Sequence, residues 1–432
     1  MALSLSTACK QPQSRPRRPY FSSGPVVKFK GWRAEDLAGP LLARSHRSSL
    51  AKTYIEGCLQ RLRHTLNLPT SYEVVLMPGS ATGAMGAALW NFLGLSGVDV
   101  WSFDLFGQRW ADDVRYGLKL GNARFFDTSL GTYPPLDKAD FDRDQVFVWN
   151  GTTSGICLQN QSWIPQKRTG LTICDATSAV LCCDLPWPLL DVTAFSLQKG
   201  FGGEAGLGFL VLSARAIEHL RAYMPSWPIP RVINLRARGK LREKLIFEGE
   251  PLNTLSLLTL QDFGASLKWI EKAGGLKAML QRVTSHAQTI DAFVKSTDTL
   301  SFLVNDSLWR SESTACLVPE DAAYSALPLE KKWGVLRDIA DLLEKEKVAY
   351  DILGHINAEP CLRLWCGPTV EAEDLCAVLP WIRWAAELVL LYRHRPPSSP
   401  RVAPKHVEDI DFKENLPYNK KDEKRKGRKH VF

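Results

Sequence analysis

The sequence predicts an α/β protein with a mostly parallel sheet, followed by a smaller α+β domain. From Val74 to Ser213, short runs of β-branched or aromatic residues alternate with helix-like stretches, as when helices cover both faces of a sheet. After about Leu260 the pattern changes to longer amphipathic helices. The length of 432 residues suits a large domain of roughly 250 residues plus a smaller one, rather than a single core.

The first part contains six predicted strands and one clear helix. The strands are Glu73–Met77, Val98–Phe103, Gln145–Trp149, Leu171–Cys174, Val192–Phe195 and Leu207–Leu212. The helix covers Ser80–Leu93 and begins directly after a Pro-Gly turn. This alternation is typical of α/β architecture.

The second part contains three predicted helices and two strands. The helices are Leu260–Lys272, Leu276–Val294 and Leu336–Lys347, and the strands are Ala349–Leu353 and Cys361–Trp365. The turn-rich segment Tyr223–Leu235 is interpreted as the crossing between the two parts. We therefore expect a disordered extension over 1–19, a large domain over 20–259 whose segment 20–50 packs with the small domain and active site, a small domain over 260–395, and a flexible basic tail over 396–432.

Charge and cysteine usage limit the class of protein. The net charge of +8 lies at the ends, because residues 1–20 carry +4 and residues 419–432 carry +5, which leaves −1 for the rest. A near-neutral body argues against a nucleic-acid surface. No apolar run approaches the ~20 uncharged residues of a membrane-spanning helix. Ten scattered cysteines without CxxC pairs indicate reduced thiols, so a cytoplasmic location is expected, although the Ser- and Arg-rich first 18 residues also fit a short targeting segment.

The first candidate catalytic residue is Lys199. In the stretch FSLQKGFGGE, an apolar strand leads through Gln198 into Lys199 and then into a glycine-rich turn. The lysine therefore lies at the carboxyl end of a strand, where α/β sheets bind their ligands. A desolvated lysine can act as a Schiff-base nucleophile, although most lysines at strand ends are solvated surface residues.

Asp175 is expected at the same edge of the sheet. It follows the apolar strand of LTICDATSA and precedes Lys199 by 24 residues, an interval that suits one αβ step. A carboxylate in this position either caps a helix or keeps a pyridine nitrogen protonated, so that the ring withdraws electrons.

The stretch MPGSATGA is a candidate phosphate site. A strand ends in Pro-Gly and a helix of small residues follows, so its first amides attract an anion and Ser80 and Thr82 add hydroxyl donors. An ordinary capped helix start explains the same residues. The phosphate site, the acid and the lysine occur in the order that an enzyme dependent on pyridoxal phosphate requires.

The chain resembles the class V aminotransferases, and within them the phosphoserine aminotransferase family. The matching stretches are FSSGP at Phe21, RSHRS at Arg44, PGSATGA at Pro78, FGQRW at Phe106, WNGTTSGI at Trp149, CDATSA at Cys174, QKGFGGEAG at Gln198, NTLS at Asn253 and LRLWCGPTVE at Leu362. They extend over roughly residues 20 to 390. The resemblance implies fold type I of the PLP-dependent transferases, with a seven-stranded sheet, and pyridoxal 5'-phosphate as cofactor.

The resemblance also implies roles for individual residues. Lys199 would bind the cofactor covalently, Asp175 would pair with its ring nitrogen and Trp110 would stack on the ring. The remaining cofactor contacts would come from Ser80, Ala81, Thr82, Thr152 and Gln198, and from Asn253 and Thr254 of a second subunit. Homodimers with shared active sites are therefore expected.

For the substrate, the resemblance implies binding by His46, Arg47, His355 and Arg363. Arginines suit a substrate with extra negative charge because each can donate two parallel hydrogen bonds to a carboxylate, whereas a surface ion pair is the common alternative. Ile356 and Asn357 stand where many family members have an arginine near the substrate phosphate.

The reaction implied is transfer of the amino group of glutamate to 3-phosphohydroxypyruvate, which yields O-phospho-L-serine for serine biosynthesis. The first alternative is a class V aminotransferase with another acceptor, of the alanine- or serine-glyoxylate type. The second is a non-catalytic relative that acts as a binding protein. Joint presence of Lys199, Asp175 and Trp110 argues against the second, because a scaffold has no physical need for them.

Overall fold

The computed structural model describes residues 10–42, 44–129 and 131–393. A seven-stranded sheet forms its centre, in the order β1 (Glu73–Pro78), β9 (Leu207–Leu212), β8 (Val192–Ser196), β7 (Thr172–Asp175), β4 (Asp144–Val148), β2 (Val98–Ser102) and β3 (Ala123–Asp127). The neighbours from β8 to β3 are parallel, whereas β9 runs antiparallel to both β8 and β1. The predicted mostly parallel sheet is confirmed.

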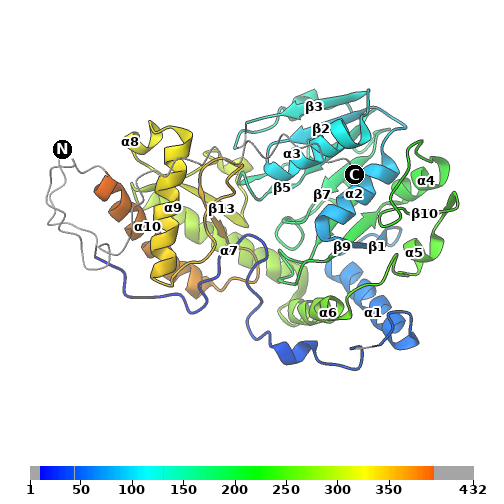
Figure 1. Cartoon of the computed structure of the whole chain (residues 1–432), viewed down its shortest axis with the longest axis horizontal. Helices are drawn as coiled ribbons and strands as arrows, with labels where there is room; N and C mark the ends of the chain where they lie inside the picture. Colours follow the sequence, from blue (N-terminus) through cyan, green and yellow to red (C-terminus); the bar gives the residue numbers. More distant parts are fainter. Residues whose placement is uncertain (1–9, 43, 130, 394–432) are drawn as a thin grey trace, which may run out of the picture.

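Helices pack around this sheet and bury their apolar residues in one cluster with those of the strands. They are α1 (Ser49–Thr65), α2 (Ser80–Phe92), α3 (Leu105–Asp112), α4 (Ala214–Ala222), α5 (Glu243–Phe247) and α6 (Leu257–Lys272). In Figure 1, α2 and α3 lie in front of the strands, and α1 and α6 lie below them. The small residues of α2 allow close approach to the strands: Gly208 of β9 has no room for a Cβ beside the carbonyl of Ser80.

A second hydrophobic cluster forms around the later part of the chain. Its elements are α7 (Gly275–Lys295), β12 (Leu300–Phe302), β13 (Thr314–Pro319), α8 (Ala322–Ser325), α9 (Leu329–Lys345), β14 (Leu362–Trp365) and α10 (Ala372–Arg393). The strands form an antiparallel sheet in the order β12-β13-β14. Figure 1 shows α9 and α10 to the left of the large sheet, with α7 between the two clusters.

Two expectations about this region differ from the structure. Ala349–Leu353 is no strand, since Tyr350 and Leu353 form only isolated bridges and Asp351 has a positive φ of 57° that interrupts extended backbone. The helix α6 buries Leu260, Phe263 and Leu267 in the first cluster, so the change of cluster occurs within α7 and not at residue 260.

The segment Tyr223–Leu235 was also interpreted wrongly as a crossing. It packs on the end of α2, where Tyr223 Oη donates to the carbonyl of Leu93 (3.1 Å) and Trp227 Nε1 donates to that of Trp90 (3.0 Å). The carbonyls at the end of a helix lack partners within it, and these side chains supply them.

Residues 10–19 do not match the expected disordered extension. Ser14 accepts a hydrogen bond from Trp381 Nε1 (2.7 Å), and the amide of Arg17 donates to Asp374 (2.6 Å), so this segment lies along α10. Residues 1–9 and the basic tail over 396–432 lie outside the described residues.

The helix α10 was not predicted. Among the residues that the structure describes, it is the one helix whose length and composition would allow it to cross a membrane. More than half of its apolar stretch is buried inside the protein. Val378, Ile382 and Val389 pack in the second cluster, as residues of a core helix do.

Candidate active site

Lys199 lies just beyond the carboxyl end of β8 and is only 7% exposed. Its amine donates to the carbonyl of Ser23 and to Thr152 Oγ1 (3.3 Å), and it lies 5.6 Å from the ring centroid of Trp365. Burial, with a further contribution from the charge of Arg363, lowers the pKa of Lys199 to about 7. A large fraction of this amine is therefore unprotonated at neutral pH and can act as a nucleophile or base.

The backbone around Lys199 is packed closely enough to require glycine. A Cβ at Gly24 would lie 3.0 Å from Cε of the lysine, and Gly24 has a φ of +151°. Gly200 likewise has no room for a Cβ beside the carbonyl of Val180. The stretch FSSGP thus brings the Ser23 carbonyl to the lysine from far away in the sequence.

Asp175 ends β7, the strand parallel and adjacent to β8. One carboxylate oxygen accepts from the amide (3.0 Å) and the hydroxyl (2.6 Å) of Thr177, and the other from Trp110 Nε1 (3.1 Å). Burial raises the pKa of Asp175, while these hydrogen bonds and the charge of Lys199 oppose the rise. The structure therefore brings the predicted lysine and acid together at one edge of the sheet.

The helix α3 positions Trp110 beside Asp175. Asp104 caps this helix by accepting from the amide of Gly107 (2.7 Å), and it also accepts from Thr153 Oγ1 (3.3 Å). Burial raises the pKa of Asp104 to about 6, and the negative charge of Asp175 contributes to the rise. Sequence reasoning missed Asp104, although an aspartate between a strand and FGQRW is a recognisable helix-start signal.

Thr152 links Lys199 through hydrogen bonds to Ser178, which lies shortly after Asp175 in the sequence. Its hydroxyl accepts from Lys199 and donates to Ser178 Oγ (2.8 Å), which in turn donates to the carbonyl of Asn150 (2.6 Å). Every member of this chain of hydrogen bonds is buried. It fixes which lone pair of Thr152 faces the amine.

The start of α2 has donors that no group of the described chain uses. Gly79 has a φ of 77°, and the amides of Gly79 and Ser80 donate to the carbonyl of Gly206 (3.1 and 3.3 Å). Within the described residues, the amides of Ala81 and Thr82 have no acceptor. Gln198 follows the end of β8, and its side-chain oxygen accepts a hydrogen bond from Ser196 Oγ (2.5 Å). These free amides fit a phosphate.

Arg363 lies near Lys199, and His355 lies near Arg363. Arg363 lies on β14, and its Nε is buried without a partner among the described residues. Its positive charge lowers the pKa of Lys199, and together with burial and the charge of Arg109 it lowers the pKa of His355. Arg109 was not predicted from the sequence, because the resemblance implies a role only for its neighbour Trp110.

The other predicted residues lie apart from this group. His46 is buried, with Nε2 unpartnered, and burial lowers its pKa. Arg47, Asn253 and Thr254 are exposed. Among the described residues, none of the four has a hydrogen bond or ion pair to Lys199, Asp175 or Arg363.

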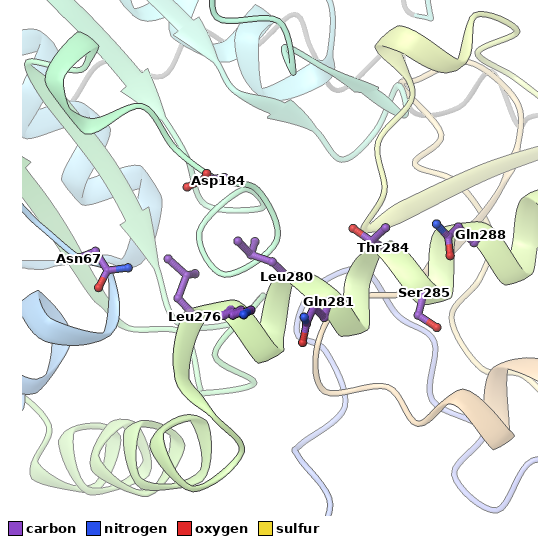
Figure 2. Close-up of a pocket in the computed structure, with 9 residues that line it drawn as sticks. Asn67, Asp184, Leu276, Leu280, Gln281, Thr284, Ser285 and Gln288 are labelled. Atoms are coloured by element: carbon purple, nitrogen blue, oxygen red, sulfur yellow. The ribbon is translucent and has the colours of Figure 1, made fainter.

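A groove of about 470 Å³ lies elsewhere, along α7 (Figure 2). It is lined by uncharged side chains such as Leu280 and Gln281 and by Asp184 and Lys277, and contains none of the predicted site residues. Its lysine, Lys277, is exposed, and no cluster of cations lines the groove, so it does not compete with the edge of the sheet as the reaction site.

Comparisons with known proteins agree with the geometry. No protein-family model matches the chain. The chain is 44% identical over 379 residues to the phosphoserine aminotransferases of Methanosarcina barkeri and of Methanosarcina mazei, which covers 88% of this chain and 100% of each relative. This identity over nearly the whole length extends well beyond the stretches around the site.

Solved structures support the fold. The phosphoserine aminotransferase from Cytophaga hutchinsonii superposes with a TM-score of 0.72 at 20% identity, over 84% of this chain and 98% of that one. The alanine–glyoxylate aminotransferase from Nostoc superposes with a TM-score of 0.69 at 16% identity, over 89% and 100%. The predicted fold of PLP-dependent aminotransferases is therefore confirmed, and the identity to the Methanosarcina enzymes shows that the chain belongs to the phosphoserine aminotransferase family.

Proposed function

We propose that this chain is a phosphoserine aminotransferase that uses pyridoxal 5'-phosphate. It transfers the amino group of glutamate to 3-phosphohydroxypyruvate, which gives O-phospho-L-serine and 2-oxoglutarate. The observation that carries the proposal is the 44% identity over 88% of the chain, with a buried lysine of lowered pKa and a buried aspartate at the ends of adjacent strands.

The residues at the sheet edge fit the cofactor. Lys199 supplies the amine for its aldehyde, Asp175 supplies a buried negative charge for a protonated ring nitrogen, and the free amides of Ala81 and Thr82 suit its phosphate. The indole of Trp110 is held beside Asp175 by its hydrogen bond, and a flat aromatic group there suits stacking on the cofactor ring. Hydroxyls of Ser80 and Thr152 and the amide side chain of Gln198 complete the polar lining.

The chemistry divides between the cofactor and the protein. When bound, pyridoxal phosphate withdraws electrons from the carbon that carries the amino group. Lys199 Nζ would move a proton between the α-carbon of the substrate and the cofactor, in one direction for glutamate and in the other for the keto acid. Asp175 keeps the ring nitrogen protonated, and Arg363, close to the amine, binds the substrate carboxylate. Glutamate and the keto acid occupy the site in turn, so ping-pong kinetics are expected.

Acceptor assays test the reaction. The purified enzyme is incubated with glutamate and, separately, 3-phosphohydroxypyruvate, pyruvate or glyoxylate, and 2-oxoglutarate is measured. We expect kcat/KM to be highest for the phosphorylated acceptor. A strong preference for pyruvate or glyoxylate would contradict the assignment and favour an aminotransferase with another acceptor. Ile356, which is exposed and stands where many family members have an arginine, is the reason to test this alternative.

Borohydride reduction tests the role of Lys199. Reduction in the presence of pyridoxal phosphate fixes the cofactor to its lysine, and mass spectrometry of the tryptic peptides then identifies that residue. We expect the label on Lys199, and its loss in Lys199→Ala. Lys119→Ala is the matched control, because Lys119 is exposed and has no ion pair within the described chain. A label elsewhere would contradict the proposal and favour a non-catalytic relative.

We also infer homodimers with shared sites and a cytoplasmic location. Asn253 and Thr254 are exposed in the connection between α5 and α6, and have no hydrogen-bond partner in the described chain. They are available to complete the phosphate contacts of a second subunit. His46 and Arg47 are proposed to bind substrate in the same way.

A further inference from the structure

Two arginines and a histidine from different elements lie near one another, since burial and the charges of Arg363 and Arg109 all lower the pKa of His355. Arg363 comes from β14, His355 from the loop that precedes it, and Arg109 from α3. Neither arginine has a carboxylate partner among the residues that the structure describes. Arg115, two turns further along the same stretch, shows the usual alternative: it pairs with Asp127 at 2.6 Å. Cations left without acids beside a reaction site favour an anionic ligand.

Arg109 directly precedes Trp110 on α3 and packs against an aromatic ring of the same helix. Its guanidinium lies 5.2 Å from the ring centroid of Phe106, one turn earlier, and the adjacent Trp110 reaches Asp175. The cap made by Asp104 fixes where the helix starts and therefore which way this turn faces. The Arg109 side chain is exposed, so it can contact a ligand that enters from solvent.

Arg363 and Arg109 differ in depth. Arg363 is half-buried and close enough to Lys199 to lower the pKa of its amine, so it suits the carboxylate next to the reacting carbon. The ring of His355 lies near both guanidinium groups, since the charges of Arg363 and Arg109 both lower its pKa. The rest of its loop offers Ile356, which is 64% exposed, and Asn357, so the loop supplies no arginine or lysine.

We propose that Arg109 binds the phosphate of the acceptor and is a determinant of specificity for a phosphorylated keto acid. The inference rests on the proposed function, because it assigns one end of that substrate to one residue. Arginine can donate two parallel hydrogen bonds to a phosphate, whereas lysine offers a single point charge. Arg109 thus supplies from α3 the cation that the loop of Ile356 and Asn357 does not.

Steady-state kinetics with a matched pair of acceptors test the inference. The acceptors are 3-phosphohydroxypyruvate and hydroxypyruvate, which differ only by the phosphate. Arg109→Gln is expected to raise KM for the phosphorylated acceptor about 10- to 100-fold, the usual effect of losing a hydrogen-bonded charge pair, with kcat little changed. KM for hydroxypyruvate should stay within about twofold. Arg109→Lys should recover part of the loss.

Two further measurements make the result specific. Arg221→Gln, the same change at an exposed arginine of α4, should leave both KM values unchanged. Calorimetric titration should show weaker binding of O-phospho-L-serine to Arg109→Gln, with binding of L-serine unaffected.

The possible results separate the inference from the proposed function. If the unmodified enzyme does not use 3-phosphohydroxypyruvate, the proposed function fails. If it does, but Arg109→Gln leaves its KM unchanged, or raises KM for both acceptors equally, Arg109 does not bind the phosphate and only the inference is overturned.

Discussion

At the scale of single residues, the protonation state of Lys199 decides whether the site can react. Its amine is buried and lies near Arg363, and both the burial and this positive charge disfavour an added proton. The charge of Asp175 favours the proton but does not outweigh burial. The amine is thus kept ready for attack on an aldehyde without a separate base.

This predicts how cofactor uptake depends on pH. A protonated amine has no lone pair, so uptake of pyridoxal phosphate by the cofactor-free protein should slow as pH falls below the pKa of Lys199, about 7. The expected decrease is about tenfold for each pH unit below that value. The rate is measured by the visible absorption of the bound cofactor after rapid mixing.

A model amine provides the reference. N-acetyl-lysine methyl amide, with the ordinary lysine pKa of 10.5, should already lose rate below that pH. If the protein followed the same curve as this free amine, Lys199 would have no lowered pKa and the account of its burial would be wrong.

Single residues also show where the sequence was informative. Lys199 and Asp175 could be predicted because each directly follows an apolar strand, and parallel neighbouring strands end at one edge. Ser23, Ser178 and Arg109 could not be assigned from their own stretches. Their roles depend on contacts between segments far apart in the sequence, such as the carbonyl of Ser23 against an amine 176 residues later.

At the scale of elements, α3 presents side chains to the site and α2 presents the amides of its first turn. The start of α3 depends on Asp104. Asp104→Ala removes the cap and leaves the Gly107 amide unpaired, and should lower the free energy of unfolding by about 1 kcal/mol. Asp104→Asn keeps an accepting oxygen and should lose much less. Urea unfolding of the cofactor-free proteins measures both.

The same pair has a pH dependence of known sign. The pKa of Asp104 is raised from 3.8 to about 6 in the folded chain, so the folded state binds more protons than the unfolded state between these values. Stability contributed by Asp104 is therefore present below pH 3.8 and is lost as pH rises to about 6. Relative to the unmodified protein, Asp104→Asn should become more stable as pH rises through this range. A constant difference between pH 4 and 7 would contradict the raised pKa.

The start of α2 provides a test with a control on the same helix. A Cβ at Gly83 would overlap the carbonyl oxygen of Pro78, so Gly83→Ala must shift the first turn that carries Ala81 and Thr82. A Cβ at Gly86 would lie 3.8 Å from Ile233 Cδ1, an ordinary contact. We expect Gly83→Ala to weaken pyridoxal phosphate binding at least about tenfold and to cost about 1–3 kcal/mol of stability.

Gly86→Ala should instead bind the cofactor normally and gain up to about 1 kcal/mol, because alanine favours helix. Spectroscopic titration and urea unfolding measure the two effects. Normal cofactor affinity in Gly83→Ala would show that the first turn of α2 does not bind the phosphate.

Elements differ in how far the sequence predicts them. The helix Ser80–Phe92 and the strands β1, β2, β4, β7, β8 and β9 lie within one or two residues of the predicted bounds, because apolar runs there are bounded by glycine, proline or polar turns. The antiparallel direction of β9 could not be predicted. Residues 197–206 connect β8 to β9 without a helix, and a run of apolar residues has the same composition in either direction.

At the scale of the whole molecule, the site is assembled from both hydrophobic clusters and from the N-terminal segment. Lys199 and Asp175 follow strands of the large sheet, Arg363 belongs to the sheet of the second cluster, and Ser23 belongs to the N-terminal segment. The division into two domains stays a prediction, but the reaction site lies where the clusters face each other. Relative movement of the clusters would therefore change the distance between Arg363 and Lys199.

Shared sites in a homodimer predict complementation between inactive variants. A chain with Asn253→Ala and Thr254→Ala retains its own Lys199, whereas a Lys199→Ala chain retains Asn253 and Thr254. If the Asn-Thr pair serves the site of the other subunit, each mixed dimer has one intact site. Random exchange of equal amounts should then restore about one quarter of the unmodified activity.

The matched control mixes Lys199→Ala with Asp175→Asn. Both residues belong to the site of one chain, since they end adjacent strands β8 and β7, so neither site of the mixed dimer is intact and no activity should return. Recovery is measured by 2-oxoglutarate production after co-refolding, with light scattering to confirm dimers. If the first mixture forms dimers but remains as inactive as the second, Asn253 and Thr254 do not complete a site across subunits.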